Sequence, residues 1–196
     1  MKKEKVLVHS CCGVCASFVV ETLKNENKEV VLFFYNPNIY PQKEYQKRLG
    51  VIKKVSKIFG VKLIVGRYEP EKWLSFVKGF EDEPEGGKRC RRCYLFRLKE
   101  TAQKAKELET KTFTTTLTIS PYKKAKLINR IGKAVGKEAG IVFLERDFKK
   151  KDGFKKTMAF AKKHNFYRQK YCGCIFSLFE NGKIRTKPEK NHGNNR

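Results

Sequence analysis

The cysteines are the residues of this sequence whose type and spacing most directly indicate chemistry. The chain contains seven, in three short groups: Cys11, Cys12 and Cys15; Cys90 and Cys93; Cys172 and Cys174. Cysteines that serve only as small buried apolar residues would be scattered along the chain instead. An odd number of cysteines in a reducing compartment also argues against a disulfide framework. The pattern therefore predicts metal binding or redox chemistry.

The number of thiols exceeds what one metal site needs. A structural zinc site takes four ligands, and Cys90 and Cys93 together with either other group would supply them. Thiolate-rich sites suit iron–sulfur clusters as well as zinc. The simplest division of the seven thiols is four for a cluster and three for a second metal, and the assignment of each cysteine stays open.

Local geometry indicates how the thiols are shared. Side chains of adjacent residues diverge in extended chain, so we expect Cys11 and Cys12 to point apart, with one serving each centre. The spacing of Cys172 and Cys174 in an extended segment places both thiols on one face, from which they could close either site. Together these features predict two metals held side by side.

Other residues near the expected strand ends are candidates for substrate contact or proton transfer. Tyr35 and Asn36 end a strand, where a role in the turn competes with substrate contact. Tyr40 either contacts substrate or covers the helix that follows it. His9 ends a buried strand, and a hydrogen-bonded packing role is favoured there over metal ligation.

Two further candidates lie in the second half of the chain. Ser120, Tyr122 and Lys123 precede an expected helix, whose free backbone N–H groups would make either an anion site or a simple N-terminal cap. Asp147, in the basic run 146–151, is either a buried acid or the counterion of its neighbours, and the counterion role is favoured.

The elements that must position these residues alternate along the chain. Expected strands are 5–9, 30–35, 61–65, 112–117 and 141–144, and expected helices are 15–23, 41–59, 68–80, 90–108, 121–136 and 154–164. This order predicts an α/β fold with a doubly wound, mostly parallel five-stranded sheet, which binds ligands outside the carboxyl ends of its strands. We expect a single domain over residues 1–186, with the last cysteines in a C-terminal extension, and a disordered polar tail over 187–196.

The charge of the chain predicts a polyanionic partner. Lys and Arg number 45 against 20 Asp and Glu, a formal net charge of +25 at pH 7 that lies mostly in the second half. Arg168 lies between Tyr167 and Tyr171, a combination that can stack on bases and bind phosphate. No signal peptide or membrane span is apparent, so we expect a soluble cytoplasmic protein without a membrane partner.

Six segments of the sequence resemble the cobalamin-independent epoxyqueuosine reductases, the QueH family. They are HSCCGVC from His9, YNPNIYPQKEYQKR from Tyr35, RCRRCYLFRL from Arg89, TTLTISPYKK from Thr115, RDFKKKDGF from Arg146 and YRQKYCGCIFSL from Tyr167. The likeness spans residues 6–179, and the first segment departs from the family in having Val14 where Pro is more common. It implies a fold similar to adenine-nucleotide α-hydrolases, a [4Fe–4S] cluster beside a second iron, and the last step of queuosine biosynthesis on tRNA.

This resemblance, taken with the residues, yields a mechanistic hypothesis. The second iron would act as a Lewis acid on the epoxide of the wobble nucleotide in the anticodon loop, while the cluster passes on two electrons from a low-potential donor. Asp147 or Tyr35 would supply protons. The candidate cluster ligands are Cys11, Cys12, Cys90, Cys93, Cys172 and Cys174, and all seven cysteines are candidate metal ligands. Substrate contacts are expected from Asn36, Tyr40, Ser120, Tyr122, Lys123 and Arg168.

Two other functions compete with this one. A tRNA thiolation enzyme would need a loop that cradles ATP phosphates after the first strand, where this chain has the thiols of HSCCGVCAS. A zinc-stabilised RNA-binding module would explain the charge and four cysteines but leaves three unused.

Overall fold

The expected alternation of strands and helices is present in the computed structural model, which describes residues 3–180 and 183–184. The elements are β1 (Lys5–His9), α1 (Gly13–Asn25), β2 (Glu29–Phe34), α2 (Gln42–Phe59), β3 (Lys62–Val65), α3 (Pro70–Val77), α4 (Lys88–Glu107), β4 (Thr112–Thr115), the 3₁₀ helix η1 (Thr116–Ile119), α5 (Ala125–Ala139), β5 (Val142–Phe143), α6 (Gly153–Lys163), α7 (Ile175–Leu178), β6 (Phe179–Glu180) and β7 (Lys183–Ile184).

The first five strands form one parallel sheet in the order β3-β2-β1-β4-β5. The predicted fold class is therefore confirmed. The chain winds outward from β1 in one direction and then, from β4, in the other, so the carboxyl ends of these two neighbours mark the point where the strand order reverses. That is the position at which such sheets bind ligands.

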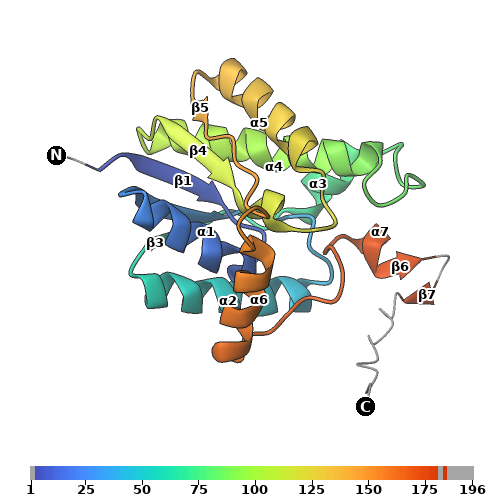
Figure 1. The fold of residues 1–196 in the computed structure, drawn as a ribbon. Coiled ribbons are helices and arrows are strands. Elements are labelled where there is room, and N and C mark those ends of the chain that lie inside the picture. The colour runs from blue at the N-terminus through green and yellow to red at the C-terminus, as the bar shows by residue number, and fades with distance from the viewer. Residues whose placement is uncertain (1–2, 181–182, 185–196) are drawn as a thin grey trace, which may run out of the picture.

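Helices cover both faces of the sheet (Figure 1), with α1, α2 and α6 on one side and α4 and α5 on the other. The side chains of the central strand β1 alternate between the two faces of the sheet. Val6 and Val8 pack in the layer that contains α1, α2 and α6, and Leu7 packs in the layer that contains α4 and α5. Because both faces are covered, the strands are apolar along nearly their whole length. The polar and thiol groups are thus displaced to the strand ends.

Two of the elements after residue 111 have bounds that differ from the prediction for a reason visible in their hydrogen bonds. The strand expected over 112–117 ends at Thr115, because the hydroxyl of that residue accepts a hydrogen bond from the backbone N–H of Leu117 (3.1 Å) and η1 begins. The helix expected over 121–136 begins at Ala125, since Lys123 N donates to Ser120 O (3.2 Å) and closes a turn first. Ser120 therefore does not cap α5, and the expected helix N-terminus at this position is wrong.

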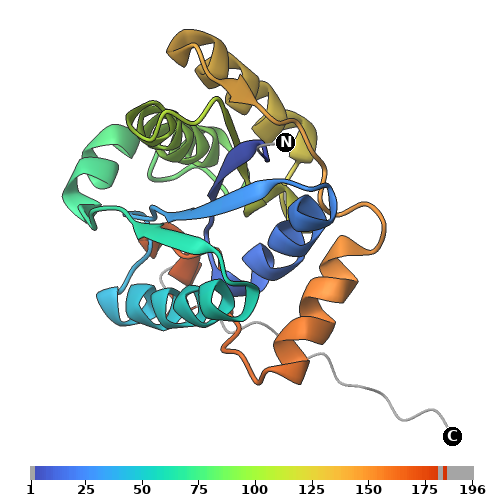
Figure 2. The ribbon, with the colours of Figure 1, turned by 90° about the vertical axis from the view of Figure 1, so that its left-hand side faces the viewer.

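The chain after α6 returns to the carboxyl edge of the sheet. The segment, orange to red in Figure 2, carries the last cysteines and ends in α7 and the small β6–β7 pair. The tail expected over 187–196 lies outside the described residues, and the single domain over 1–186 stays a prediction. None of the helices described is long and apolar enough to cross a membrane.

Candidate metal centre

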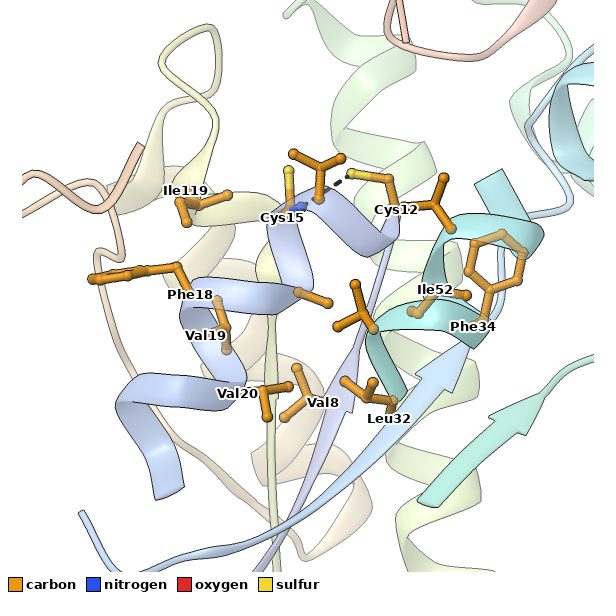
Figure 3. Packing of buried hydrophobic residues seen from close by; sticks show 14 of the residues in the cluster. Val8, Cys12, Cys15, Phe18, Val19, Val20, Leu32, Phe34, Ile52 and Ile119 are labelled. Atoms are coloured by element: carbon orange, nitrogen blue, oxygen red, sulfur yellow. Dashed lines mark hydrogen bonds between the residues drawn. The ribbon is translucent and has the colours of Figure 1, made fainter. Parts of the chain in front are cut away.

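Three thiols gather where β1 passes into α1. The sulfur atoms of Cys11, Cys12 and Cys15 all lie within 4.8 Å of one another. Cys12 caps α1, and its sulfur accepts a hydrogen bond from the backbone N–H of Cys15 (3.4 Å). Figure 3 shows both side chains at the N-terminal end of α1, above the apolar layer that contains Val8 and Leu32. We call these three residues the thiol triad.

The expectation that Cys11 and Cys12 diverge is wrong. Alternation of side chains holds along a continuous strand, but β1 ends at His9 and the chain turns into α1 at Gly13. The turn brings both sulfurs to the side of Cys15, which lies in the first turn of the helix. A single ion could therefore contact all three thiols of the triad.

The triad holds negative charge. Hydrogen bonds from the thiols of Cys12 and Cys15, together with the positive charges of Lys123 and Arg97, lower the pKa of Cys11 well below its usual value. The same contact with Cys11 raises the pKa of Cys12 to about 12 and raises that of Cys15. Cys11 is thus the thiol of the triad that ionises most readily, and a bound metal would displace the remaining thiol protons.

The remaining four cysteines form a second group, the thiol tetrad: Cys90, Cys93, Cys172 and Cys174. Cys90 and Cys93 lie three residues apart in the first two turns of α4, which places them on one face of the helix. Cys93 and Cys174 share one buried cluster.

The members of the tetrad influence one another electrostatically. Burial, and then the charges of Cys174, Cys172 and Cys90, raise the pKa of Cys93 to about 11. Burial, followed by the charges of Cys172 and Cys174, also raises the pKa of Cys90. Burial also raises the pKa of Cys174, and a cation or a cationic iron–sulfur core would offset the cost of ionising these buried thiols.

Arg48 holds the C-terminal cysteines in place. It forms a buried ion pair with Glu44 (2.8 Å) and donates to the carbonyls of Cys172 (2.9 Å) and Tyr171 (3.2 Å). Tyr167 donates to the same Glu44 carboxylate (2.6 Å). Residues from α2 thereby fix a segment that is more than 120 residues away in the sequence.

Two cations face both groups of thiols. Burial works to lower the pKa of Arg97, but the negative charges of Cys93, Cys11 and Cys172 outweigh it and raise the value. Lys123 behaves in the same way, with Cys172 and Cys11 among the groups that raise its pKa. Because each cation is influenced by a member of the triad and a member of the tetrad, the two groups border a common region at the sheet edge.

His9 and Asn36 build the floor of this region. The ring of His9 is fully buried and contacts the Thr115 hydroxyl (2.9 Å) and the Tyr35 carbonyl (3.2 Å), which agrees with the packing role. Asn36 is also fully buried; it donates to the Ser10 carbonyl (2.9 Å) and accepts from Arg97 (3.3 Å). Asn36 thus positions Arg97.

The two tyrosines predicted at the site have different environments. The Tyr35 ring is buried between Phe33 and Phe96, and burial followed by the charges of Glu100 and Glu69 raises the pKa of its hydroxyl. Tyr40 has a half-exposed side chain, and its backbone binds the C-terminal segment through Tyr40 N to Gly173 O (2.7 Å).

The other predicted residues lie around the rim. Asp147 accepts from the backbone N–H of Lys149 (3.1 Å) and pairs with its ammonium group (3.2 Å), as expected for a counterion. The same ammonium donates to the carbonyl of Lys123 (3.2 Å). Tyr122 and Arg168 are exposed, and Ser120 lies half-buried in the turn before Lys123.

Sequence reasoning missed the residues that support the thiols. Arg97 follows Cys93 by four residues, and helical spacing could have placed it on the face of the cysteines. Arg48 on α2 binds the backbone of the last cysteine segment, and Gln169 donates to the Cys12 sulfur (3.4 Å). No local pattern indicates these last two contacts.

Comparison with known proteins points to one family. The family described as epoxyqueuosine reductase QueH matches residues 6–180. The QueH protein of Thermotoga maritima is 37% identical over 191 residues, which cover 96% of this chain and 97% of that protein. That of Streptococcus pyogenes serotype M1 is 36% identical over 181 residues, covering 89% of this chain and 71% of the relative.

Solved structures support the fold. A predicted subunit of a tRNA methyltransferase from Methanocaldococcus jannaschii superposes with a TM-score of 0.58 at 15% identity, covering 82% of this chain and 76% of that one. The U34-tRNA thiolase NcsA of Methanococcus maripaludis, described with its [4Fe-4S] cluster, superposes with a TM-score of 0.52 at 13% identity. The match covers 90% of this chain and 61% of that one.

The fold and the gathered thiols define a metal-binding α/β oxidoreductase. Its relatives share the whole of the described core and not an isolated motif. The chain belongs to the QueH family of epoxyqueuosine reductases. Membership decides against both the thiolation enzyme and the zinc-stabilised RNA-binding module.

Proposed function

We propose that this protein converts epoxyqueuosine, at the wobble position of a tRNA, into queuosine. Two electrons and two protons remove the epoxide oxygen as water, and a carbon–carbon double bond remains. The observation that carries the proposal is that the triad sulfurs gather at the carboxyl edge of the sheet, and that Cys93 and Cys172 of the tetrad act on the same cation, Arg97, as Cys11 does, in a chain of the QueH family.

The donor sets fit two different metal centres. The tetrad matches the four thiolates that bind a [4Fe–4S] cluster, and the triad offers three ligands to a single iron and leaves room for a further ligand. When bound, the cluster would transfer electrons from a low-potential donor, and the iron would polarise the epoxide oxygen.

The protein contributes charge compensation around these thiols. Arg97 is 3% exposed and stays cationic beside Cys93 and Cys11, so it lowers the cost of placing several thiolates together. Lys123 adds a second positive charge at the same region. Asp147 acts on the site through Lys149, which binds the Lys123 carbonyl and so holds the turn that carries this cation.

We assign the supply of the two protons to side chains that remain protonated near neutral pH. The Tyr35 hydroxyl keeps its proton because burial raises its pKa. Asp147 is half-buried and paired with Lys149, which favours the role of positioning Lys123 over that of acid. Tyr35 is therefore the acid that we propose, because its hydroxyl keeps its proton and Asp147 is paired with Lys149.

The substrate nucleotide reaches the thiols from the anticodon loop. A single-stranded loop base is splayed out at small cost and stacks on aromatic side chains. Tyr40 and Tyr122 have exposed rings, and Arg168 is an exposed cation on the C-terminal segment. These residues would hold the base and its phosphates, and a tRNA substrate places the activity in the cytoplasm.

The test is anaerobic incubation of the iron- and sulfide-loaded protein with epoxyqueuosine tRNA and a low-potential reductant. Mass analysis of the nucleosides should show the loss of one oxygen. We expect Cys90→Ser to lose the brown colour and the reductase activity and to keep most of its tRNA affinity, because the change removes one cluster ligand from a buried position.

Arg168→Ala is the complementary control. It should keep the colour and bind tRNA more weakly, because Arg168 is an exposed cation and not a thiol ligand. A loaded wild-type protein that leaves the epoxide unreduced would contradict the proposal.

A further inference from the structure

Two buried N–H groups beside the thiol tetrad have no hydrogen-bond partner. Among the residues that the structure describes, five buried side-chain nitrogen or oxygen atoms are unpaired, and the nitrogens are Trp73 Nε1 and Arg89 Nε. Trp73 is 2% exposed and Arg89 is 4% exposed. Unpaired buried donors are rare in folded proteins, because each has lost its hydrogen bond to water.

Both residues border the tetrad. Trp73, on α3, packs in the same buried cluster as Cys93 and Cys174. Arg89 precedes Cys90 on α4, and its charge acts on the thiols of Cys90 and Cys174. The ring of Phe176 lies against both, 4.7 Å from the Arg89 guanidinium and 6.1 Å from the Trp73 ring. The two unpaired donors thus belong to one layer of side chains.

The other hydrogen bonds of Arg89 hold its guanidinium in place. Its Nη1 donates to the carbonyls of Phe80 (3.4 Å) and Glu81 (2.5 Å), whereas Nε remains unused. A side chain held in this way cannot turn its Nε toward water without losing those bonds. A group bound at the tetrad could supply the acceptor that this nitrogen lacks.

We propose that Trp73 and Arg89 are positioning residues that donate hydrogen bonds to the sulfur atoms of the tetrad and of the iron–sulfur group bound there, and so raise its reduction potential. This inference rests on the metal loading in the proposed function. Reduction adds negative charge to the sulfurs, and N–H donors stabilise that charge. Sulfur accepts hydrogen bonds weakly in the thiol form and more strongly as thiolate or sulfide, which explains why both donors are unpaired without the group.

The first test measures the midpoint potential of the loaded protein by dye-mediated titration with electron paramagnetic resonance detection. Trp73→Phe keeps an aromatic ring and removes the N–H donor. We expect a more negative potential, with the equilibrium constant for reduction lowered about three- to tenfold, at 59 mV per tenfold for a one-electron couple. Arg89→Lys, which keeps the charge and removes Nε, should shift the potential in the same direction.

Phe76→Leu is the matched control on the same helix. Phe76 packs against Phe96 near the tetrad and carries no donor, so this variant should keep the wild-type potential. Equal potentials in Trp73→Phe, Arg89→Lys and wild type, at equal iron and sulfide content, would overturn the proposal.

A second measurement needs no variant. Trp73 is the single tryptophan of the chain, so indole-¹⁵N labelling marks one nitrogen only. Electron–nuclear double resonance on the reduced wild-type protein should detect hyperfine coupling to this nitrogen and to an exchangeable proton. Absence of that coupling overturns the role of Trp73 even if the Trp73→Phe variant fails to fold.

The outcomes separate this inference from the proposed function. A cluster that shows the coupling and the shifted potential, in a protein that leaves epoxyqueuosine unreduced, contradicts the proposed function alone. An active enzyme with neither effect contradicts this inference alone. A wild-type chain that takes up no iron and sulfide under anaerobic reconstitution overturns both.

Discussion

His9 lies at the end of β1, and its hydrogen bonds determine which ring nitrogen carries the proton. The Tyr35 carbonyl can only accept, so Nε2 carries the hydrogen, and Nδ1 accepts from the Thr115 hydroxyl. That hydroxyl also accepts from Leu117 N, where η1 begins. A neutral His9 therefore joins the central strand, the Tyr35 turn and η1 just beneath the triad. Burial, with a further contribution from the charge of Arg97, lowers its pKa to about 3.

We predict that His9 makes stability dependent on pH in the acid range. Its pKa is about 3 in the folded protein and 6.5 in the unfolded chain. Only the unfolded chain binds the proton between these values, so the stabilisation is complete above pH 6.5 and is lost as the pH falls. From pH 8 to pH 5 the contribution to the free energy of unfolding should fall by about 2 kcal/mol.

The measurement is urea unfolding of the metal-free protein at both pH values, with His9→Gln as the control. Gln can still donate to the Tyr35 carbonyl but does not titrate. The difference in free energy of unfolding between wild type and variant should be smaller at pH 5 than at pH 8. If the unfolding free energies of the two proteins changed equally with pH, His9 would titrate as it does in an unfolded chain.

Among the elements, α2 has two roles in building the metal centre. Arg48 and Glu44 near its N-terminus hold the backbone of Tyr171 and Cys172. Its middle packs closely on the start of α1, where a Cβ atom on Gly13 would lie 2.6 Å from the backbone N of Ile52. One helix thereby positions the first and the last groups of cysteines against the same sheet edge.

We predict that Gly13→Ala destabilises the protein by about 1–3 kcal/mol, because the added methyl group meets helix backbone that cannot move aside. The same clash should displace α1 and reduce metal binding by the triad. Chemical denaturation and metal analysis would measure the two effects.

Gly50→Ala is the matched control on α2. Nothing lies within 4 Å of a Cβ atom at that position, and the residue is exposed within the helix. This variant should gain about 0.5–1 kcal/mol through better helix propensity. If Gly13→Ala were as stable as Gly50→Ala, the close approach of α1 and α2 would be disproved.

At the scale of the whole molecule, the excess of cations is related to the common direction of the strands. All five strands of the main sheet are parallel, so the thiols collect at one edge, while α4 runs from Lys88 at that edge to Glu107 at the other. Lys150, Lys155 and Arg168 are exposed on segments that follow the carboxyl end of β5. With a net charge of +25, the protein is suited to bind a polyanion as large as tRNA.

We predict that tRNA affinity falls steeply with salt, and that it does so through cations at the thiol edge. Replacing Lys150, Lys155 and Arg168 by Ala should reduce the slope of log affinity against log salt by about 2 to 3, because each lost phosphate contact removes about 0.7–0.9. Filter binding at salt concentrations from about 50 to 200 mM would measure the slope.

The matched control replaces Lys106, Lys111 and Lys137 by Ala. These exposed residues lie near the ends of α4 and α5 and the start of β4, at the amino edge of the sheet, and their loss changes the net charge equally. The control should keep the wild-type slope. If both triple variants reduced the salt slope equally, tRNA binding would depend on net charge alone.

Much of the fold could be predicted from local patterns. The apolar runs of β1 and β2 and the helical spacing of α2 indicated an α/β alternation, and Gly60, with φ of +61°, ends α2 where expected. Errors arose where a side chain or turn overrode the pattern: the Thr115 hydroxyl ended a strand early, and the turn at Ser120 delayed a helix.

The sequence by itself determined the number and spacing of the thiols, the parallel α/β fold and the family, because these depend on residue type and on neighbours within a few positions. Only the tertiary structure decided that Cys11 and Cys12 stay together, and that Arg48 holds a segment 124 residues away. It also decided that Arg97 is buried between both groups of thiols. Contacts of this kind depend on the packing of whole elements around the sheet edge, which local periodicity does not encode.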